Sequence, residues 1–135
     1  MTKIITRWLV LVAITVVTNN AAADTGVIDM WKTEPVDGIG YLYINIEPCD
    51  EHLCGTITFA FGPTDEPNPG YEHIGKKMVW GMESKTESSW GGGKIWDPRG
   101  TKVYNSKMVL KGDVLNVSGC FLLFCSGQKW ARVKQ

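Results

Sequence analysis

Apolar and polar side chains alternate with a period of two in short runs along most of this chain. In residues 41–47, for example, Leu42, Ile44 and Ile46 share one face, and Tyr, Asn and Glu residues occupy the other. Successive side chains of a β-strand point to opposite faces of a sheet, so this alternation is typical of half-buried strands. After residue 23, no stretch has the apolar stripe of an amphipathic helix. The pattern therefore predicts an all-β protein.

Turn-forming residues divide the chain into about eight predicted strands, namely residues 27–32, 41–47, 56–61, 78–83, 90–96, 104–110, 115–121 and 130–133. Their connections contain no crossover helix, which favours an antiparallel meander in sequence order. Eight such strands can close into a barrel that is filled by side chains or holds one small ligand. A two-sheet sandwich is the alternative architecture. The connection 62–76 contains three Pro residues and is long for a hairpin, so it is expected to be a lid, a contact surface or a tolerated insertion.

Residues 1–23 have the three parts of a secretory signal peptide. Lys3 and Arg7 give a basic start, Trp8–Val17 form an apolar middle, and Ala21-Ala22-Ala23 match a cleavage site. The apolar stretch is shorter than the roughly 20 residues that span a bilayer, although a retained anchor helix is the alternative. We therefore expect residues 24–135 to be one domain, exported to a bacterial periplasm, without stable membrane insertion after cleavage.

Four Cys residues occur in two pairs with equal spacing, Cys49 with Cys54 and Cys120 with Cys125. Three pairings are possible, and the equal four-residue spacers favour two local disulfides. A four-Cys metal site is the alternative. Zinc sites usually have a closer Cys-x-x-Cys spacing, and an oxidising compartment disfavours free thiolates. The sequence thus predicts two disulfides, no metal and no cofactor.

The charge balance excludes a typical nucleic-acid-binding domain. The chain has 14 acidic and 14 basic residues, and two of the basic ones lie in the leader. The remaining domain is therefore slightly acidic, whereas binding to nucleic acid requires a basic patch or stripe. The motifs of common hydrolases and zinc enzymes are absent, so we do not expect an enzyme; an envelope hydrolase is a distant alternative.

Several motifs together resemble those of a bacterial domain-of-unknown-function family, numbered twenty-one forty-seven. The most specific is the element Ile95-x-Asp97-Pro98-x-x-x-x-x-Tyr104 within residues 93–108. Other matching pieces, in order, are Trp31, Cys54-Gly55-x-Ile57, Asn68-Pro69, Ile74-Gly75, Gly119-Cys120 and Gln128-x-Trp130-x-Arg132. Ser126, Lys129 and Ala131 depart from the family pattern. The resemblance implies a small secreted protein with a lipocalin-like β-barrel, and it implies no particular reaction.

Three groups of residues have candidate roles. Trp31 and Arg132 resemble the pair that closes the base of lipocalin barrels, through an Arg over a Trp face. Asp97, Pro98 and Gly100 are interpreted as a β-turn, with ligand contact as the alternative. The candidate ligand-binding residues are the large apolar side chains expected inside the barrel, with Lys94 or Tyr104 as a polar anchor: Phe59, Trp80, Met82, Trp90, Tyr104 and Met108.

Two functions fit this interpretation. The first is binding of a small apolar or amphipathic ligand, such as a lipid fragment, inside the barrel. The second is a structural or interaction role in the cell envelope, with a filled core and no ligand. The interior volume distinguishes them, because a ligand needs a cavity of about 300 Å³ or more.

Overall fold

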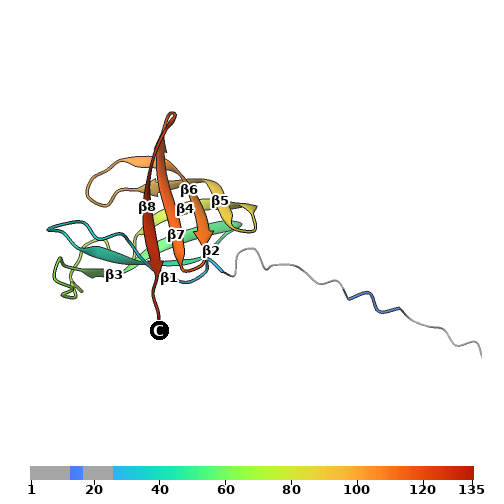
Figure 1. Ribbon diagram of the computed structural model, residues 1–135, viewed down its shortest axis with the longest axis horizontal. Helices are drawn as coiled ribbons and strands as arrows, with labels where there is room; N and C mark the ends of the chain where they lie inside the picture. The colour runs from blue at the N-terminus through green and yellow to red at the C-terminus, as the bar shows by residue number, and fades with distance from the viewer. Residues whose placement is uncertain (1–12, 17–25) are drawn as a thin grey trace, which may run out of the picture.

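Eight strands form in the part of the chain described by the structure, a computed structural model that covers residues 13–16 and 26–135. They are β1 (Met30–Lys32), β2 (Tyr41–Cys49), β3 (His52–Phe61), β4 (Lys77–Thr86), β5 (Ser89–Trp96), β6 (Val103–Lys111), β7 (Val114–Phe121) and β8 (Phe124–Arg132). Each strand pairs antiparallel with the next, and β8 pairs with β1 to close a barrel (Figure 1). The predicted all-β meander and barrel are confirmed, and the sandwich is excluded. The predicted leader, residues 1–23, lies outside the described residues except for 13–16.

The turn residues explain why neighbouring strands pair in sequence order. Between β6 and β7, only Gly112 and Asp113 connect the paired residues Lys111 and Val114. Gly112 has a φ of 60°, which a two-residue hairpin turn requires at this position and which glycine adopts without strain. Gly112 and Asp113 therefore form a tight turn that places β6 and β7 side by side.

Bulges alter which side chains face the interior. The pairing of β2 with β3 shifts between Tyr43 and Ile44, so that Thr58 is an extra residue between Phe59 and Ile57. β4 and β5 also have irregular pairing, at Gly81 and Gly92, both of which have positive φ. A bulge inserts one residue and so moves the following side chains to the opposite face of the sheet.

Large side chains fill one half of the barrel. Three tryptophans, Trp31, Trp90 and Trp130, are completely or almost completely buried there. They pack in one cluster with aliphatic and Met side chains from the surrounding strands: Ile44, Ile46, Leu53, Met82, Met108 and Leu115. This half, which we call the base, is the hydrophobic core that holds the eight strands together.

Arg132 closes the base. Its guanidinium carbon lies 4.5 Å from the centroid of the Trp31 ring, and the two residues are directly paired between β8 and β1. Its Nη1 donates to Asp29 Oδ2 at 2.8 Å and to the Gly26 carbonyl at 2.9 Å, and its Nε donates to Asp113 Oδ1 at 3.0 Å. One side chain of β8 thus ties together the segment that precedes β1, the Trp31 ring of β1 and the β6–β7 turn.

The ion pair between Asp29 and Arg132 makes stability depend on pH. The hydrogen bond from Arg132 lowers the pKa of Asp29, although partial burial opposes this effect. The stabilisation is therefore complete above the ordinary Asp pKa of about 3.9, and it is lost as pH falls through the lowered value. We expect the free energy of unfolding to fall more between pH 5 and pH 2 in the wild type than in Asp29→Asn, measured by urea denaturation. Equal losses in the two proteins would contradict this role for Asp29.

Disulfides join the two local Cys pairs, Cys49–Cys54 and Cys120–Cys125. The first bridges β2 and β3 near their turn. The second joins directly paired residues at the opposite end of the barrel, next to the β7–β8 turn. Each bridge therefore fixes the end of one hairpin.

Candidate ligand-binding cavity

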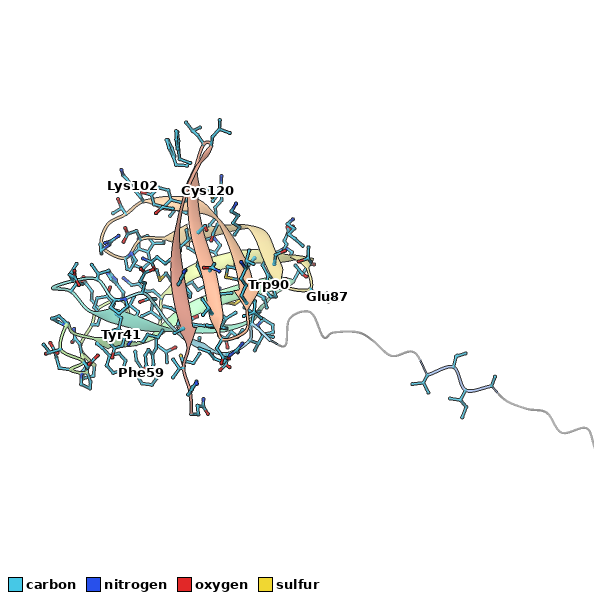
Figure 2. The ribbon with its side chains drawn as sticks, viewed as in Figure 1. Tyr41, Phe59, Glu87, Trp90, Lys102 and Cys120 are labelled. Carbon is cyan, nitrogen blue, oxygen red and sulfur yellow. A yellow bond between two sulfur atoms is a disulfide. The ribbon has the colours of Figure 1, made fainter. Side chains whose placement is uncertain are left out.

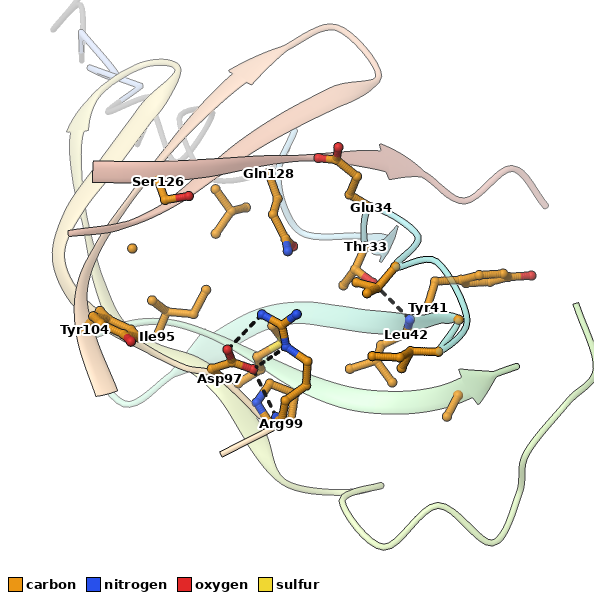
Figure 3. A pocket seen from close by; sticks show the side chains of 18 of the residues that line it. Thr33, Glu34, Tyr41, Leu42, Ile95, Asp97, Arg99, Tyr104, Ser126 and Gln128 are labelled. Atoms are coloured by element: carbon orange, nitrogen blue, oxygen red, sulfur yellow. Dashed lines mark hydrogen bonds and ion pairs between the residues drawn. The ribbon is translucent and has the colours of Figure 1, made fainter. Parts of the chain in front are cut away.

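A cavity of about 690 Å³ occupies the end of the barrel opposite the base (Figure 3). Seven strands contribute to its wall at this end, through Leu42, Ala60, Met78, Ile95, Tyr104, Val117 and Gln128. Ile39, Phe121 and Phe124 also line the cavity and are exposed. The cavity therefore opens to solvent at this end, which we call the mouth.

The deeper part of the cavity is apolar. Val117 belongs to the buried core, and Leu42 and Ile95 pack against that core. Gly119 contributes no side chain to the wall, and a Cβ atom there would lie 3.2 Å from Cγ2 of Ile95. The floor is thus continuous with the tryptophan-rich base, and the small residues Ala60 and Gly119 leave the volume above it empty.

Asp97 and Arg99 form an ion pair at the mouth (Figure 3). Arg99 donates to both carboxylate oxygens of Asp97, from Nη2 at 2.9 Å and from Nε at 3.0 Å, and its backbone N–H donates at 3.0 Å. These hydrogen bonds lower the pKa of Asp97 despite its partial burial. At neutral pH the mouth therefore presents a fixed carboxylate and a fixed guanidinium.

Two further polar side chains face the cavity from the side of β1 and β8. The carbonyl oxygen of Gln128 accepts a hydrogen bond from Trp130 Nε1 at 3.1 Å, so its amide nitrogen remains as the group that can donate to a ligand (Figure 3). The hydroxyl of Thr33 accepts from the backbone N–H of Leu42 at 3.0 Å. The cavity thus combines an apolar floor with a few fixed polar groups, which is the usual composition of a small-molecule site.

Of the six residues that the sequence suggested as ligand contacts, Tyr104 lines the cavity. Met82, Trp90 and Met108 lie in the core below it. These three side chains point into the barrel, as the alternation predicted, but they fill the base and support the floor from beneath. Their role in the structure is packing.

The expected inward positions of Phe59 and Trp80 are wrong. Phe59 is 52% exposed and forms an edge-to-face contact with Tyr43 on the outer surface, because the bulge at Thr58 places Ile57 and Ala60 inside instead. Trp80 is half-buried and pairs with the exposed Lys94, because β4 has an irregularity beside Gly81. Both rings are therefore placed on the outer face of the sheet.

Lys94 is also on the outer surface, where it donates a hydrogen bond to Asn105. It does not line the cavity, so it cannot serve as the polar anchor that the sequence suggested. Tyr104, the other candidate anchor, has the required position.

The segment Asp97–Gly100 forms a β-turn at the mouth. The backbone N–H of Gly100 donates to the Asp97 carbonyl at 3.0 Å, and Pro98 occupies the second position. Asp97 and Pro98 line the cavity as well, so the structural role and the alternative of ligand contact coexist in this segment.

Thr33, Arg99 and Gln128 line the cavity and are not among the site residues predicted from the sequence. Arg99 could have been suspected, because an Asp-x-Arg spacing in a turn allows the two side chains to pair. Thr33 follows a very short strand, and the depth of Gln128 in the barrel is known only once the register of β8 is known. Alternation places both on the inward face, two residues from Trp31 and Trp130, but it does not show that they lie at the level of the cavity.

Among residues 13–16 and 26–135, no group of three or more His, Cys, Asp or Glu side chains is placed to hold a metal ion. The same residues include no helix long and apolar enough to cross a membrane.

Comparison with solved structures finds a similar fold in a lipocalin. The protein HP1028 from the human pathogen Helicobacter pylori, described as belonging to the lipocalin family, superposes with a TM-score of 0.60. The match covers 78% of this chain and 82% of that chain, at 11% sequence identity. This likeness supports the fold alone.

No curated protein matches the sequence. A family model described as "Uncharacterized protein conserved in bacteria (DUF2147)" matches residues 30–132, which include all eight strands. The resemblance that the motifs indicated is thereby confirmed. The chain belongs to this bacterial family of uncharacterised proteins, with a lipocalin-like barrel.

Proposed function

We propose that this protein is an exported bacterial carrier that binds one small apolar or amphipathic molecule in the cavity. The observation that carries the proposal is the cavity of about 690 Å³, with an apolar floor and polar groups at its mouth. This volume lies within the range of about 300–1,000 Å³ that is typical of small-molecule sites. The apolar part of the ligand would occupy the floor, and a polar headgroup would lie near Asp97 and Arg99.

The filled base limits how long a bound chain can be. Burying one methylene group contributes about 0.8 kcal/mol, so each added carbon should increase affinity about fourfold while the cavity has room. Trp31, Trp90 and Trp130 occupy the space below the floor. Further carbons would have to remain outside the mouth, where each contributes less to the binding free energy because it stays exposed to water.

A binding role fits the mouth better than a catalytic role. A general acid or base works best with a pKa near the working pH, whereas the pKa of Asp97 is lowered by Arg99. The pair is suited to orienting a polar headgroup. We therefore propose no enzymatic activity.

Export to the periplasm is part of the proposal. Two disulfides in a small domain are typical of proteins from oxidising compartments, and the first 23 residues have the pattern of a cleaved leader. A periplasmic carrier would act on molecules that are poorly soluble in water. The alternative of an envelope protein with a filled core has less support, because the half of the barrel near the mouth is hollow.

A series of straight-chain carboxylates of increasing length tests this proposal. Residues 24–135, which contain all strands and both disulfides, are loaded with the fluorescent probe 1-anilinonaphthalene-8-sulfonate, and each carboxylate is titrated as a competitor. We expect displacement of one probe per protein, with affinity rising about fourfold per methylene and then levelling off. A failure to bind the probe saturably, or an affinity that increases without a plateau, would contradict a cavity of defined size.

A further inference from the structure

The turn between β7 and β8 carries four consecutive large apolar residues on the outside of the molecule. Phe121, Leu122, Leu123 and Phe124 are 66%, 81%, 96% and 81% exposed. They form the end of a hairpin that extends beyond the barrel at the top of Figure 1, and we call them the apolar tip. Exposed large apolar residues that are contiguous mark an interaction site more often than scattered ones do.

Leu122 occupies a turn position that suits glycine better than leucine. Leu122 has a φ of 55°, and among the described residues it is the one residue other than Gly or Asp with a positive φ. Leucine is strained in this region, and glycine is the usual residue at such a turn position. The Cys120–Cys125 disulfide holds the hairpin directly below the tip. A covalent clamp thus keeps strained, exposed apolar residues in place, as expected of a functional loop.

Two exposed lysines lie on the part of the barrel wall next to the tip. After Pro98 the sequence has seven Lys or Arg residues and a single acidic residue, Asp113. Of these, Lys111 and Arg132 lie at the base, and Arg99 is paired with Asp97. Asp113 lies at the base, at the other end of the barrel, and is paired with Arg132. Lys107 lies on β6 and Lys102 directly precedes this strand, and both side chains are exposed. β6 pairs with β7 through Asn105 and Cys120. Figure 2 labels Lys102 and Cys120 at this end of the barrel. The surface next to the tip is therefore positively charged.

We propose that the apolar tip inserts into an anionic lipid bilayer surface and holds the cavity mouth against the membrane. Phe and Leu side chains transfer favourably from water into a bilayer, and nearby Lys residues are attracted to anionic headgroups. Phe121 and Phe124 also line the mouth, so insertion would bring the cavity entrance to the lipid. The proposal concerns the tip and does not require that the cavity be loaded.

A bilayer fits this surface better than a folded protein partner does. A stable protein interface usually buries about 800 Å² on each side, over 20–30 residues. The apolar tip is narrow and convex, with two residues at its turn. Insertion into a fluid layer needs no complementary groove, and the adjacent positive charge favours anionic lipids.

Vesicle flotation tests the proposal with residues 24–135. One set of vesicles contains phosphatidylglycerol and phosphatidylcholine in equal parts, and the other contains phosphatidylcholine alone. We expect the wild type to float with the anionic vesicles, and we expect Leu122→Gly combined with Leu123→Ser to weaken this binding at least about tenfold. Because Gly suits the left-handed turn position, this variant should keep the wild-type melting temperature and both disulfides.

Two further variants separate the contribution of the lysines to vesicle binding from that of the apolar tip. Lys102→Gln combined with Lys107→Gln should weaken binding to the anionic vesicles about tenfold, with little effect on neutral vesicles. Phe59→Ser, which removes an exposed ring from a different wall, should bind like the wild type.

The proposal is overturned if the wild type does not float with anionic vesicles, or if the tip variant floats equally well. It is also overturned if the wild type sediments as a dimer that the tip variant dissociates, because the tip would then contact a second copy. Failure of the probe titration would not alter these outcomes, so the two proposals are tested separately.

Discussion

Replacing Trp31 with alanine should lower the free energy of unfolding by about 3–5 kcal/mol. The ring is completely buried, and it supports the guanidinium of Arg132 at the closed base. β1 has only three residues, so the contact between β1 and β8 depends strongly on this side chain. Urea denaturation of residues 24–135, followed by Trp fluorescence, measures the change.

Trp80→Ala is the matched control, because it removes the same side chain from the outer face of β4. Trp80 is half-buried, and its loss should cost about 1 kcal/mol. Equal destabilisation by the two substitutions would contradict the assignment of Trp31 to the core and of Trp80 to the outer face.

Ala60→Phe should abolish most ligand binding without harming the fold. Ala60 is buried and lines the cavity, where a larger side chain can occupy the empty volume. We expect the affinity for the probe and for the longest carboxylates to fall about a hundredfold, because the ring takes the space of the apolar chain. Stability should be unchanged or raised by about 0.5–2 kcal/mol, since the substitution fills a cavity.

Asn105→Phe is the control for this substitution. It adds the same ring to the exposed face of β6, next to a residue that lines the cavity. Ligand affinity should be unchanged. If both variants bind like the wild type, the ligand does not occupy the cavity.

The fold could be predicted from the sequence because strands and tight turns are specified by residues that are neighbours in the chain. Leu42, Ile44 and Ile46 alternate without interruption on β2, and Gly112-Asp113 specifies a tight turn. Three consecutive glycines within a strand, Gly91–Gly93, are typical of a bulge or bend, and the pairing of β5 with β6 shifts there. Such signals require only neighbouring residues.

The candidate site could not be predicted to the same extent, because it depends on register. A bulge at Thr58 moves Phe59 to the outer surface and Ala60 to the interior, and no local pattern distinguishes this arrangement from a regular strand. The depth of each inward residue also matters. Met108 and Tyr104 share one face of β6, yet Met108 lies in the core and Tyr104 lines the cavity. That difference arises only when eight strands close around a shared axis.

Native mass spectrometry of the protein purified from a bacterium that expresses it with its own leader tests the central claim most directly. The account predicts a processed chain with both disulfides and one bound small molecule, which organic extraction releases and identifies as apolar or amphipathic. Ala60→Phe, prepared in the same way, should lack the bound molecule. A bare wild-type mass, together with no saturable probe binding, would contradict the claim that the cavity holds a ligand.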